Sequence, residues 1–182
     1  MKKNKISKNW INKQRRDVYV KQSIVEGYNS RAVYKLKEID EKFKIFKNGN
    51  SIIDLGAAPG SWSQYVSKKV KHAKILSIDL LDFEKIEKIY QIKGDFTDDV
   101  SKKKIKDYYG SKVDVVMSDM AVNTTGNKNL DSINTSELCI EAMNFSKEVL
   151  KEDGKFISKI FMGSTFNEII YESKKIFKEN KV

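Results

Sequence analysis

Residues 54–62 read DLGAAPGSW, and this stretch decides the fold. It follows the apolar run 51–53 and contains the only proline of the chain. An apolar run, a turn of small residues and a helix-like segment indicate a strand that enters a helix through a tight loop. Gly56 and Gly60 permit positive φ angles and a close approach of the backbone, so the loop is suited to a ligand at a helix N-terminus.

Apolar runs and helical patterns alternate along the rest of the chain. This alternation predicts an α/β, Rossmann-like fold with a doubly wound, mostly parallel sheet. A loop is expected at 121–131 and a turn at 153–154. We expect strands at 51–53, 73–78, 89–92, 113–117 and 156–161, and helices at 31–43, 62–70, 99–109, 136–150 and 165–177.

Four of the five expected strands end at an acidic residue: Asp54, Asp79, Asp95 and Asp119. The carboxyl ends of parallel strands meet at one edge of a sheet, which is where such folds bind ligands. Asp79 alone does not discriminate, because both ligand types place an acid after the second strand to hold a ribose. A pyrophosphate would be repelled by Asp54, Asp95 and Asp119, whereas a sulfonium ligand with an ammonium group would be attracted. The glycine spacing G-x-x-x-G also differs from the dinucleotide pattern G-x-G-x-x-G. The sequence therefore favours S-adenosylmethionine (SAM) over a nicotinamide cofactor.

The chain of 182 residues has 35 Lys and Arg against 25 Asp and Glu, a net charge of +10. Residues 1–37 alone hold 11 Lys and Arg and 2 acids. We expect a basic, partly helical arm at 1–30 and a single domain at 31–182. The charge indicates a polyanionic partner, with nucleic acid favoured over an acidic membrane surface; a lysine-rich background is the alternative explanation.

Several classes of protein are disfavoured. Cys139 is the only cysteine, so no internal disulfide is possible, and no Cys/His cluster predicts a metal site. No apolar run is long enough for a membrane span, and the basic N-terminus has no apolar signal core. We expect a cytoplasmic monomer without a membrane partner; an amphipathic organelle presequence is the weaker alternative.

Six motifs then occur in a fixed order across most of the chain. They are SRAVYKL at 30–36, DLGAAPGSWSQ at 54–64, DLL at 79–81, GDF at 94–96, VMSDMA at 116–121 and SKIFMG at 158–163. This set resembles the FtsJ/RrmJ-like ribosomal RNA 2′-O-methyltransferases. The resemblance implies SAM contacts at Gly56, Gly60, Trp62, Asp79, Asp95 and Asp119.

The resemblance also implies a catalytic tetrad, of which three members match: Lys35, Asp119 and Lys159. The fourth, a glutamate in a segment of the form SRxxSxExY, has no counterpart here, and the family's two last strands are missing as well. We therefore expect a sheet that lacks those two strands. A protein that binds SAM and RNA without turnover is one alternative that follows from this difference.

Lys159 is the candidate for the chemistry, either as a general base or as a group that orients the ribose 2′-OH. The simpler explanation for Lys159 is a surface lysine whose aliphatic stem packs on apolar side chains. The simpler explanation for Lys35 is a position on the solvated face of a helix. Trp62 could equally be a core residue. The resemblance implies a uridine of large-subunit (23S-type) ribosomal RNA as target, with transfer RNA or the messenger cap as alternatives.

Overall fold

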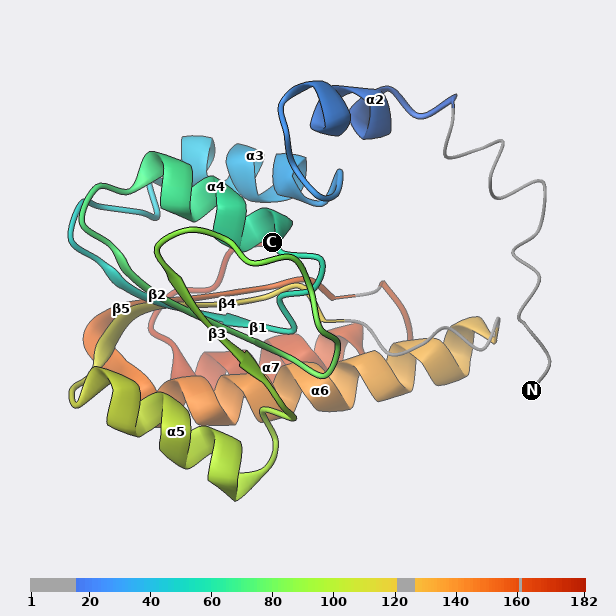
Figure 1. The fold of residues 1–182 in the computed structure, drawn as a ribbon. Helices are drawn as coiled ribbons and strands as arrows, with labels where there is room; N and C mark the ends of the chain where they lie inside the picture. The colour runs from blue at the N-terminus through green and yellow to red at the C-terminus, as the bar shows by residue number, and fades with distance from the viewer. Residues whose placement is uncertain (1–15, 121–126, 161) are drawn as a thin grey trace, which may run out of the picture.

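The computed structural model describes residues 16–120, 127–160 and 162–182 (Figure 1). Helices and strands alternate along the chain as the sequence predicts. The elements are α2 (Val18–Val25), α3 (Val33–Phe43), β1 (Ser51–Leu55), α4 (Ser61–Lys69), β2 (Lys74–Asp79), β3 (Ile89–Lys93), α5 (Asp99–Tyr109), β4 (Val113–Ser118), α6 (Lys128–Val149), β5 (Leu150–Ser158) and α7 (Phe166–Ile176).

Five parallel strands form one sheet in the order β3-β2-β1-β4-β5. The chain therefore builds outward from β1 to β3 and then returns to the other side of β1 with β4 and β5. This reversal makes the sheet doubly wound and places the switch point between β1 and β4. Ligands bind such folds at the switch point, beyond the carboxyl ends of the strands.

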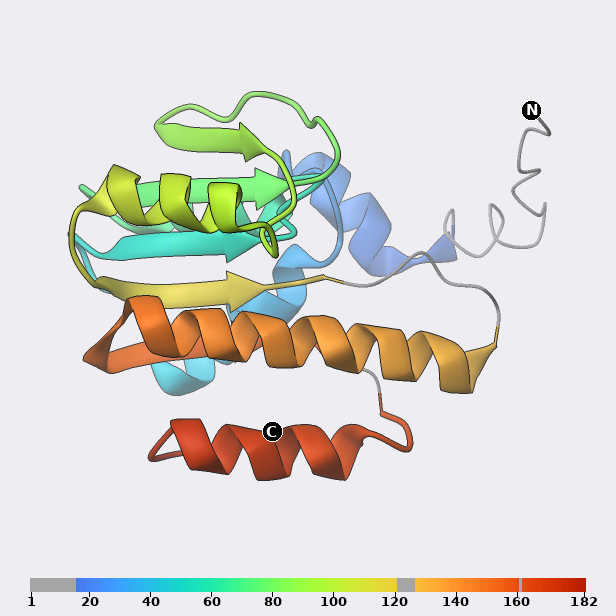
Figure 2. The same cartoon turned by 90° about the horizontal axis from the view of Figure 1, so that it is seen from below.

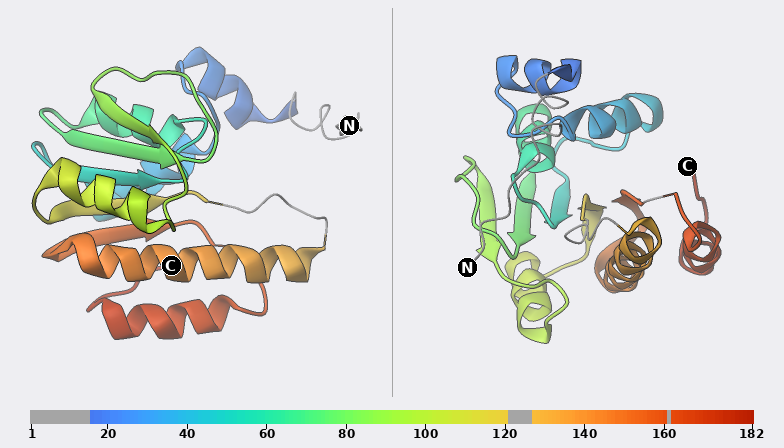
Figure 3. Two further views of the ribbon diagram at one scale, coloured as in Figure 1. Left: turned by 60° about the horizontal axis from the view of Figure 1, so that its bottom comes forward. Right: turned by 90° about the vertical axis from the view of Figure 1, so that its right-hand side faces the viewer.

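Helices cover both faces of the sheet (Figure 3). Neighbouring residues of β1 point to opposite faces, as the pleat requires. Ile52 packs with Val33 of α3 and Val66 of α4, whereas Ile53 packs with Ile105 of α5 and side chains of α6. Helix α7 lies outside α6, and the two helices share the small cluster Cys139, Met143 and Ile169. Cys139 is a buried core residue.

Helix α6 begins at Lys128, eight residues before the expected start, so the expected loop at 121–131 is wrong for its last residues. Residues 121–126 lie outside the described part. The segment lacks an apolar stripe because small polar side chains take its buried positions. Ser132 and Ser136 are both buried, and Ser136 Oγ donates to Ser132 O at 2.7 Å.

Strand β5 begins at Leu150 rather than at 156, because it pairs with β4 on both sides of an irregularity. Val113 pairs with Leu150, but Val115 pairs with Lys155, so residues 151–154 lie opposite Asp114 alone. The turn expected at 153–154 is therefore a bulge inside the strand. Phe161, the expected last residue of this strand, lies outside the described part.

Helix α2 lies on the side of the molecule toward which the strands point (Figure 2). Its N-cap Asp17 accepts hydrogen bonds from the backbone N–H groups of Tyr19 and Val20. Residues 1–15 of the expected basic arm lie outside the described part, so the boundary of the arm at residue 30 stays a prediction. Among the helices that the structure describes, none is long and apolar enough to cross a membrane.

Candidate active site

The structure places the acidic residues at the carboxyl edge of the sheet. Asp79 is the last residue of β2, and Asp119 follows the last residue of β4. Asp95 lies two residues beyond β3, where its carboxylate accepts hydrogen bonds from the backbone N–H and the hydroxyl of Thr97 at 2.9 and 2.7 Å. Because the strands are parallel, residues far apart in the sequence meet at one edge.

The glycine loop (residues 56–60) connects β1 to α4. Gly56 and Gly60 have φ angles of 69° and 99°, which side chains rarely allow. A Cβ atom on Gly60 would lie 2.7 Å from Ile86 Cδ1, so the loop packs closely against the segment that follows β2. Asp79 holds the two segments together: its carboxylate accepts hydrogen bonds from the N–H groups of Ala58 and Leu81, both at 2.8 Å.

Asp54 lies beneath the loop with no exposed surface. Ser63 Oγ donates to Asp54 Oδ2 at 2.5 Å and lies 2.6 Å from Ser77 Oγ, whereas Asp54 Oδ1 has no hydrogen-bond partner in the described part of the chain. Burial raises the pKa of Asp54 to about 7, and the nearby carboxylates of Asp119 and Asp79 contribute to this increase. The site thus holds a buried acid that an incoming positive charge would stabilise in its ionised form.

Lys159 and Asp119 form an ion pair at the ends of two neighbouring strands. The backbone N–H of Lys159 donates to Ser118 O at 2.9 Å, which continues the ladder between β4 and β5. Lys159 Nζ lies 2.5 Å from Asp119 Oδ1 and donates to Asp119 O at 3.0 Å. Both side chains keep about a fifth of their surface exposed, at 23% and 19%. The pair is therefore fixed by the backbone and remains open to a substrate.

Lys35 is not brought into contact with this pair. It lies on the exposed side of α3, and its side chain forms no hydrogen bond or ion pair with any residue that the structure describes. Trp62 has a side chain that is only 3% exposed, and its indole N–H donates to Ala32 O at 3.0 Å. A contact between Trp62 and SAM would therefore have to come from its backbone N–H, which lies in the first turn of α4.

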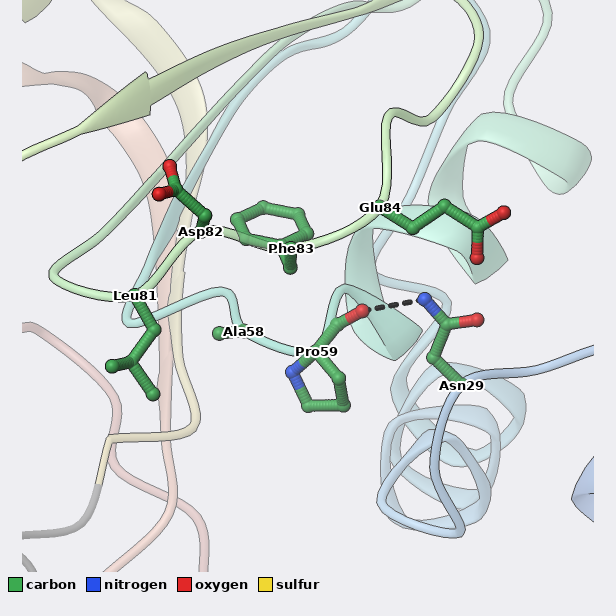
Figure 4. A pocket seen from close by; sticks show the side chains of 7 residues that line it. All are labelled: Asn29, Ala58, Pro59, Leu81, Asp82, Phe83 and Glu84. Carbon is green, nitrogen blue, oxygen red and sulfur yellow. Dashed lines mark hydrogen bonds between the residues drawn. The ribbon is translucent and has the colours of Figure 1, made fainter.

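A pocket of about 520 Å³ lies beside the glycine loop (Figure 4). This volume falls within the range of small-molecule sites. The loop contributes Ala58 and Pro59, and Asn29 reaches in from the segment between α2 and α3. Leu81, Asp82, Phe83 and Glu84 complete the lining. No cluster of potential metal ligands occurs among the residues in the described ranges.

Sequence reasoning missed the polar residues that join the N-terminal segment to the loop. Asn29 Nδ2 donates to Pro59 O at 2.6 Å (Figure 4), and Ser30 Oγ lies 2.8 Å from Ser61 Oγ. The only available signal was that Ser30 falls within the motif at 30–36 and that Pro59 and Ser61 fall within the motif at 54–64, while Asn29 directly precedes the first of these. A single amide residue beside a motif does not reveal its partner 30 residues away.

Comparisons with known proteins identify the class of this fold and site. Residues 28–182 match the FtsJ-like methyltransferase family, and the chain belongs to that family. The resemblance found in the sequence is therefore confirmed. A TehB-like SAM-dependent methyltransferase of Corynebacterium glutamicum shares the fold alone, with a TM-score of 0.53 at 16% identity over 92% of this chain and 80% of that one.

Closer relatives carry more specific names. The chain is 67% identical to a ribosomal RNA large subunit methyltransferase E of Pelagibacter ubique, over all of this chain and 90% of the relative. It is 46% identical to the protein of the same name from Rickettsia akari, over 96% of this chain and 80% of the relative. A crystal structure described as a ribosomal RNA methyltransferase of Plasmodium falciparum superposes with a TM-score of 0.76 at 33% identity, over 84% and 88% of the two chains.

Proposed function

We propose that this methyltransferase uses SAM to methylate a ribose 2′-OH of large-subunit ribosomal RNA, with a uridine as the target. The observation that carries the proposal is the Lys159–Asp119 pair, held by the sheet at the edge where the acidic residues meet. The names of the Pelagibacter and Rickettsia relatives support ribosomal RNA as the substrate. The 2′-OH and the uridine rest on the resemblance of the motifs to the RNA 2′-O-methyltransferases.

The residues at this edge fit SAM. The buried Asp54 Oδ1 lacks a donor within the described part, and an ammonium group or a water bound to it would supply one. Asp79 stands at the end of the second strand, where folds of this class hold a ribose. When bound, SAM supplies an electrophilic methyl group on a sulfonium. The glycine loop would hold its carboxylate and Asp95 its adenosine side.

Lys159 Nζ donates one hydrogen bond, to Asp119 O, and forms an ion pair with Asp119 Oδ1, which has no hydrogen-bond partner in the described part of the chain. The ammonium group has three N–H donors, so it keeps at least one for the substrate. Such a donor can hold a lone pair of the 2′-OH and orient the oxygen toward the methyl group, and such positioning supplies much of the rate of a displacement reaction. In this role the new O–C bond would form as the methyl–sulfur bond breaks, the neutral thioether would leave, and the 2′-OH proton would be lost to solvent afterwards. The alternative is that Lys159 loses a proton and acts as general base. A pH–rate profile separates the two roles, because a base role requires an ionisation that limits the rate near neutral pH.

The RNA would be held by cationic side chains on the same side as the site. Arg31, just before α3, and Lys35, in its first turn, are both exposed, and the whole chain carries a charge of +10. Arg31 also forms an ion pair with Asp17, which a phosphate would have to share or displace. Such contacts bind phosphates without reading sequence. Transfer RNA and the messenger cap present the same 2′-OH, so they remain the alternative substrates.

The test is transfer of labelled methyl groups from SAM to undermodified large ribosomal subunits, followed by nucleoside analysis. We expect a 2′-O-methyluridine that disappears with Lys159→Ala. Lys155→Ala is the matched control, because Lys155 lies within β5 but its Nζ donates to Lys44 O and Ile45 O, just beyond the end of α3. Transfer to a base rather than a ribose would refute the proposed chemistry. SAM binding without transfer to any of the three RNA classes would favour a binding protein without turnover.

A further inference from the structure

The segment between α2 and α3 (residues 27–32) is joined to the cofactor side of the molecule by a polar junction. Gln64 of α4 and Asn29 form a reciprocal pair. The backbone N–H of Asn29 donates to Gln64 Oε1, and Gln64 Nε2 donates to Asn29 Oδ1, both at 2.9 Å. With the bond from Asn29 Nδ2 to Pro59 O, three polar groups of one residue are directed at the loop and the helix that follows it.

Two further bonds extend this junction toward α3. Ser30 Oγ pairs with the buried Ser61 Oγ at 2.8 Å, and Ala32 O accepts the indole N–H of Trp62 at 3.0 Å. The partners are about 30 residues apart in the sequence. The junction therefore fixes the beginning of α3 against the beginning of α4, which are the two segments that carry the proposed RNA-binding and cofactor-binding residues.

Burial alone already anchors α3. Val33 and Leu36 are fully buried against the sheet, and together they hold the helix in place. Asn29, in contrast, is exposed, and Gln64 is only half-buried. Exposed amides add little to a core that is already packed, but their directional bonds fix the position of Asn29 against the glycine loop and α4. Lys35 follows Ala32 within one helical turn.

We propose that Asn29 and Gln64 are positioning residues for the RNA. Their amide pair holds the backbone that leads into α3 against the glycine loop and α4. It thereby sets where Lys35 lies relative to the loop, so that a bound ribose is presented to Lys159, whereas the side chain of Arg31 is held by an ion pair with Asp17. This inference rests on the proposed function. Asn29 and Gln64 would not contact the reacting atoms. Replacing them should lower the rate of methyl transfer and leave the binding of SAM and of RNA unchanged.

The variants are Asn29→Ala, Gln64→Ala and the double variant, and Gln22→Ala is the control. Gln22 is an exposed amide of α2 that bonds only to Glu26, at 2.7 Å. The measurements are the single-turnover rate on undermodified large subunits, the Kd for SAM, the Kd for RNA and the melting temperature. We expect the rate to fall about tenfold or more in each single variant, because small misplacements of a substrate are costly.

If Asn29 and Gln64 act as a pair, the effects of the two substitutions on the rate of methyl transfer should be coupled. The double variant should be no slower than Asn29→Ala, because residues that act as one unit are not additive. Both dissociation constants should stay within about twofold of wild type, as expected when only presentation is lost. Gln22→Ala should match wild type in every measurement.

Three results would overturn the inference while leaving the proposed function intact. They are an unchanged rate in both single variants, a loss of RNA affinity at an unchanged rate, and a parallel loss of SAM affinity, melting temperature and rate. The second would make Asn29 an RNA contact, and the third would make the junction merely structural. Absence of methyl transfer by the wild-type chain would instead refute the proposed function, and this inference with it.

Discussion

Asp54 is the residue whose charge the fold constrains most. Its pKa is raised to about 7 from an ordinary value of 3.8, because the carboxyl is buried beneath the glycine loop. In the range between these values the folded chain keeps a proton that the unfolded chain has released. Stability should therefore fall as the pH rises from about 4 to about 7 and should then level off.

Asp54→Asn removes this ionisation. We expect the variant to gain stability relative to wild type as the pH is raised from 5 to 8, by more than about 1 kcal/mol, since one pKa unit corresponds to about 1.4 kcal/mol. Urea unfolding at both pH values measures the difference. Asp107→Asn, a change at an exposed site on α5, is the control. A difference between Asp54→Asn and wild type that does not vary with pH would contradict the assignment.

Gly60 is the second residue with a sharp prediction. Gly60→Ala adds a Cβ atom 2.7 Å from Ile86 Cδ1 and 3.1 Å from the ring of Phe83, at a φ of 99°. Gly110→Ala has a similar φ of 65° but meets nothing within 4 Å. We expect a loss of about 1 kcal/mol for Gly110→Ala. Gly60→Ala should lose at least about 1 kcal/mol more because of overpacking. Equal losses in urea unfolding would show that the close packing of the loop has no energetic weight.

At the scale of elements, Asp40 ties α3 to α4. The side chain is 1% exposed, accepts hydrogen bonds from Tyr65 OH at 2.8 Å and Ile45 N at 2.9 Å, and forms an ion pair with Lys69. Burial alone would raise the pKa of Asp40, but the bonds from Lys69, Tyr65 and the backbone outweigh it and lower the pKa.

We expect Asp40→Asn to lower the free energy of unfolding by about 2–3 kcal/mol at pH 7, as for other hydrogen bonds to a buried charge. Because the folded pKa is depressed, the advantage of wild type is present in full above pH 4 and is lost as the pH falls further. Glu38→Gln on the exposed side of α3 is the matched control. A loss of the same size at pH 3 would mean that the charge of Asp40 is not what stabilises the two helices.

The elements also show where sequence patterns suffice. Strands β1, β2 and β4 are buried along nearly their whole length, as expected of parallel strands covered on both faces, and each has an apolar centre. Their positions were predicted to within two residues. The beginning of α6 was missed because Ser132, Thr135 and Ser136 take buried positions without apolar side chains. A periodicity of apolar residues cannot reveal a helix that buries hydroxyl groups.

At the scale of the whole molecule, the net charge of +10 predicts RNA binding that weakens with salt. Replacing Arg31 and Lys35 by Ala should reduce the slope of log Kobs against log salt by about 1.4, or about 0.7 for each charge lost on a single strand. Lys174→Ala with Lys178→Ala removes the same charge from exposed positions in or just beyond α7, across the sheet from α3. An equal change in slope from both pairs would mean that RNA contacts the molecule without a preferred face.

The site was predictable only in part. Acidic residues at strand ends and glycines in a turn can be recognised locally in the sequence. Because the strands are parallel, the sheet brings these residues together at one edge. The junction of Asn29 with Gln64 depends instead on how two helices approach each other in space. No spacing within the sequence encodes that approach, and neither residue stands out by its type.

The position of Lys159 at the end of β5 also has a consequence for the order of synthesis. Asp54, Asp79, Asp95 and Asp119 all leave the ribosome before Lys159, whose partner Asp119 precedes it by 40 residues. A growing chain can therefore assemble the proposed cofactor edge from β1 to β4 while the lysine is still to come. On the proposed function, the cofactor side of the site would form first, and the reactive lysine would follow with β5.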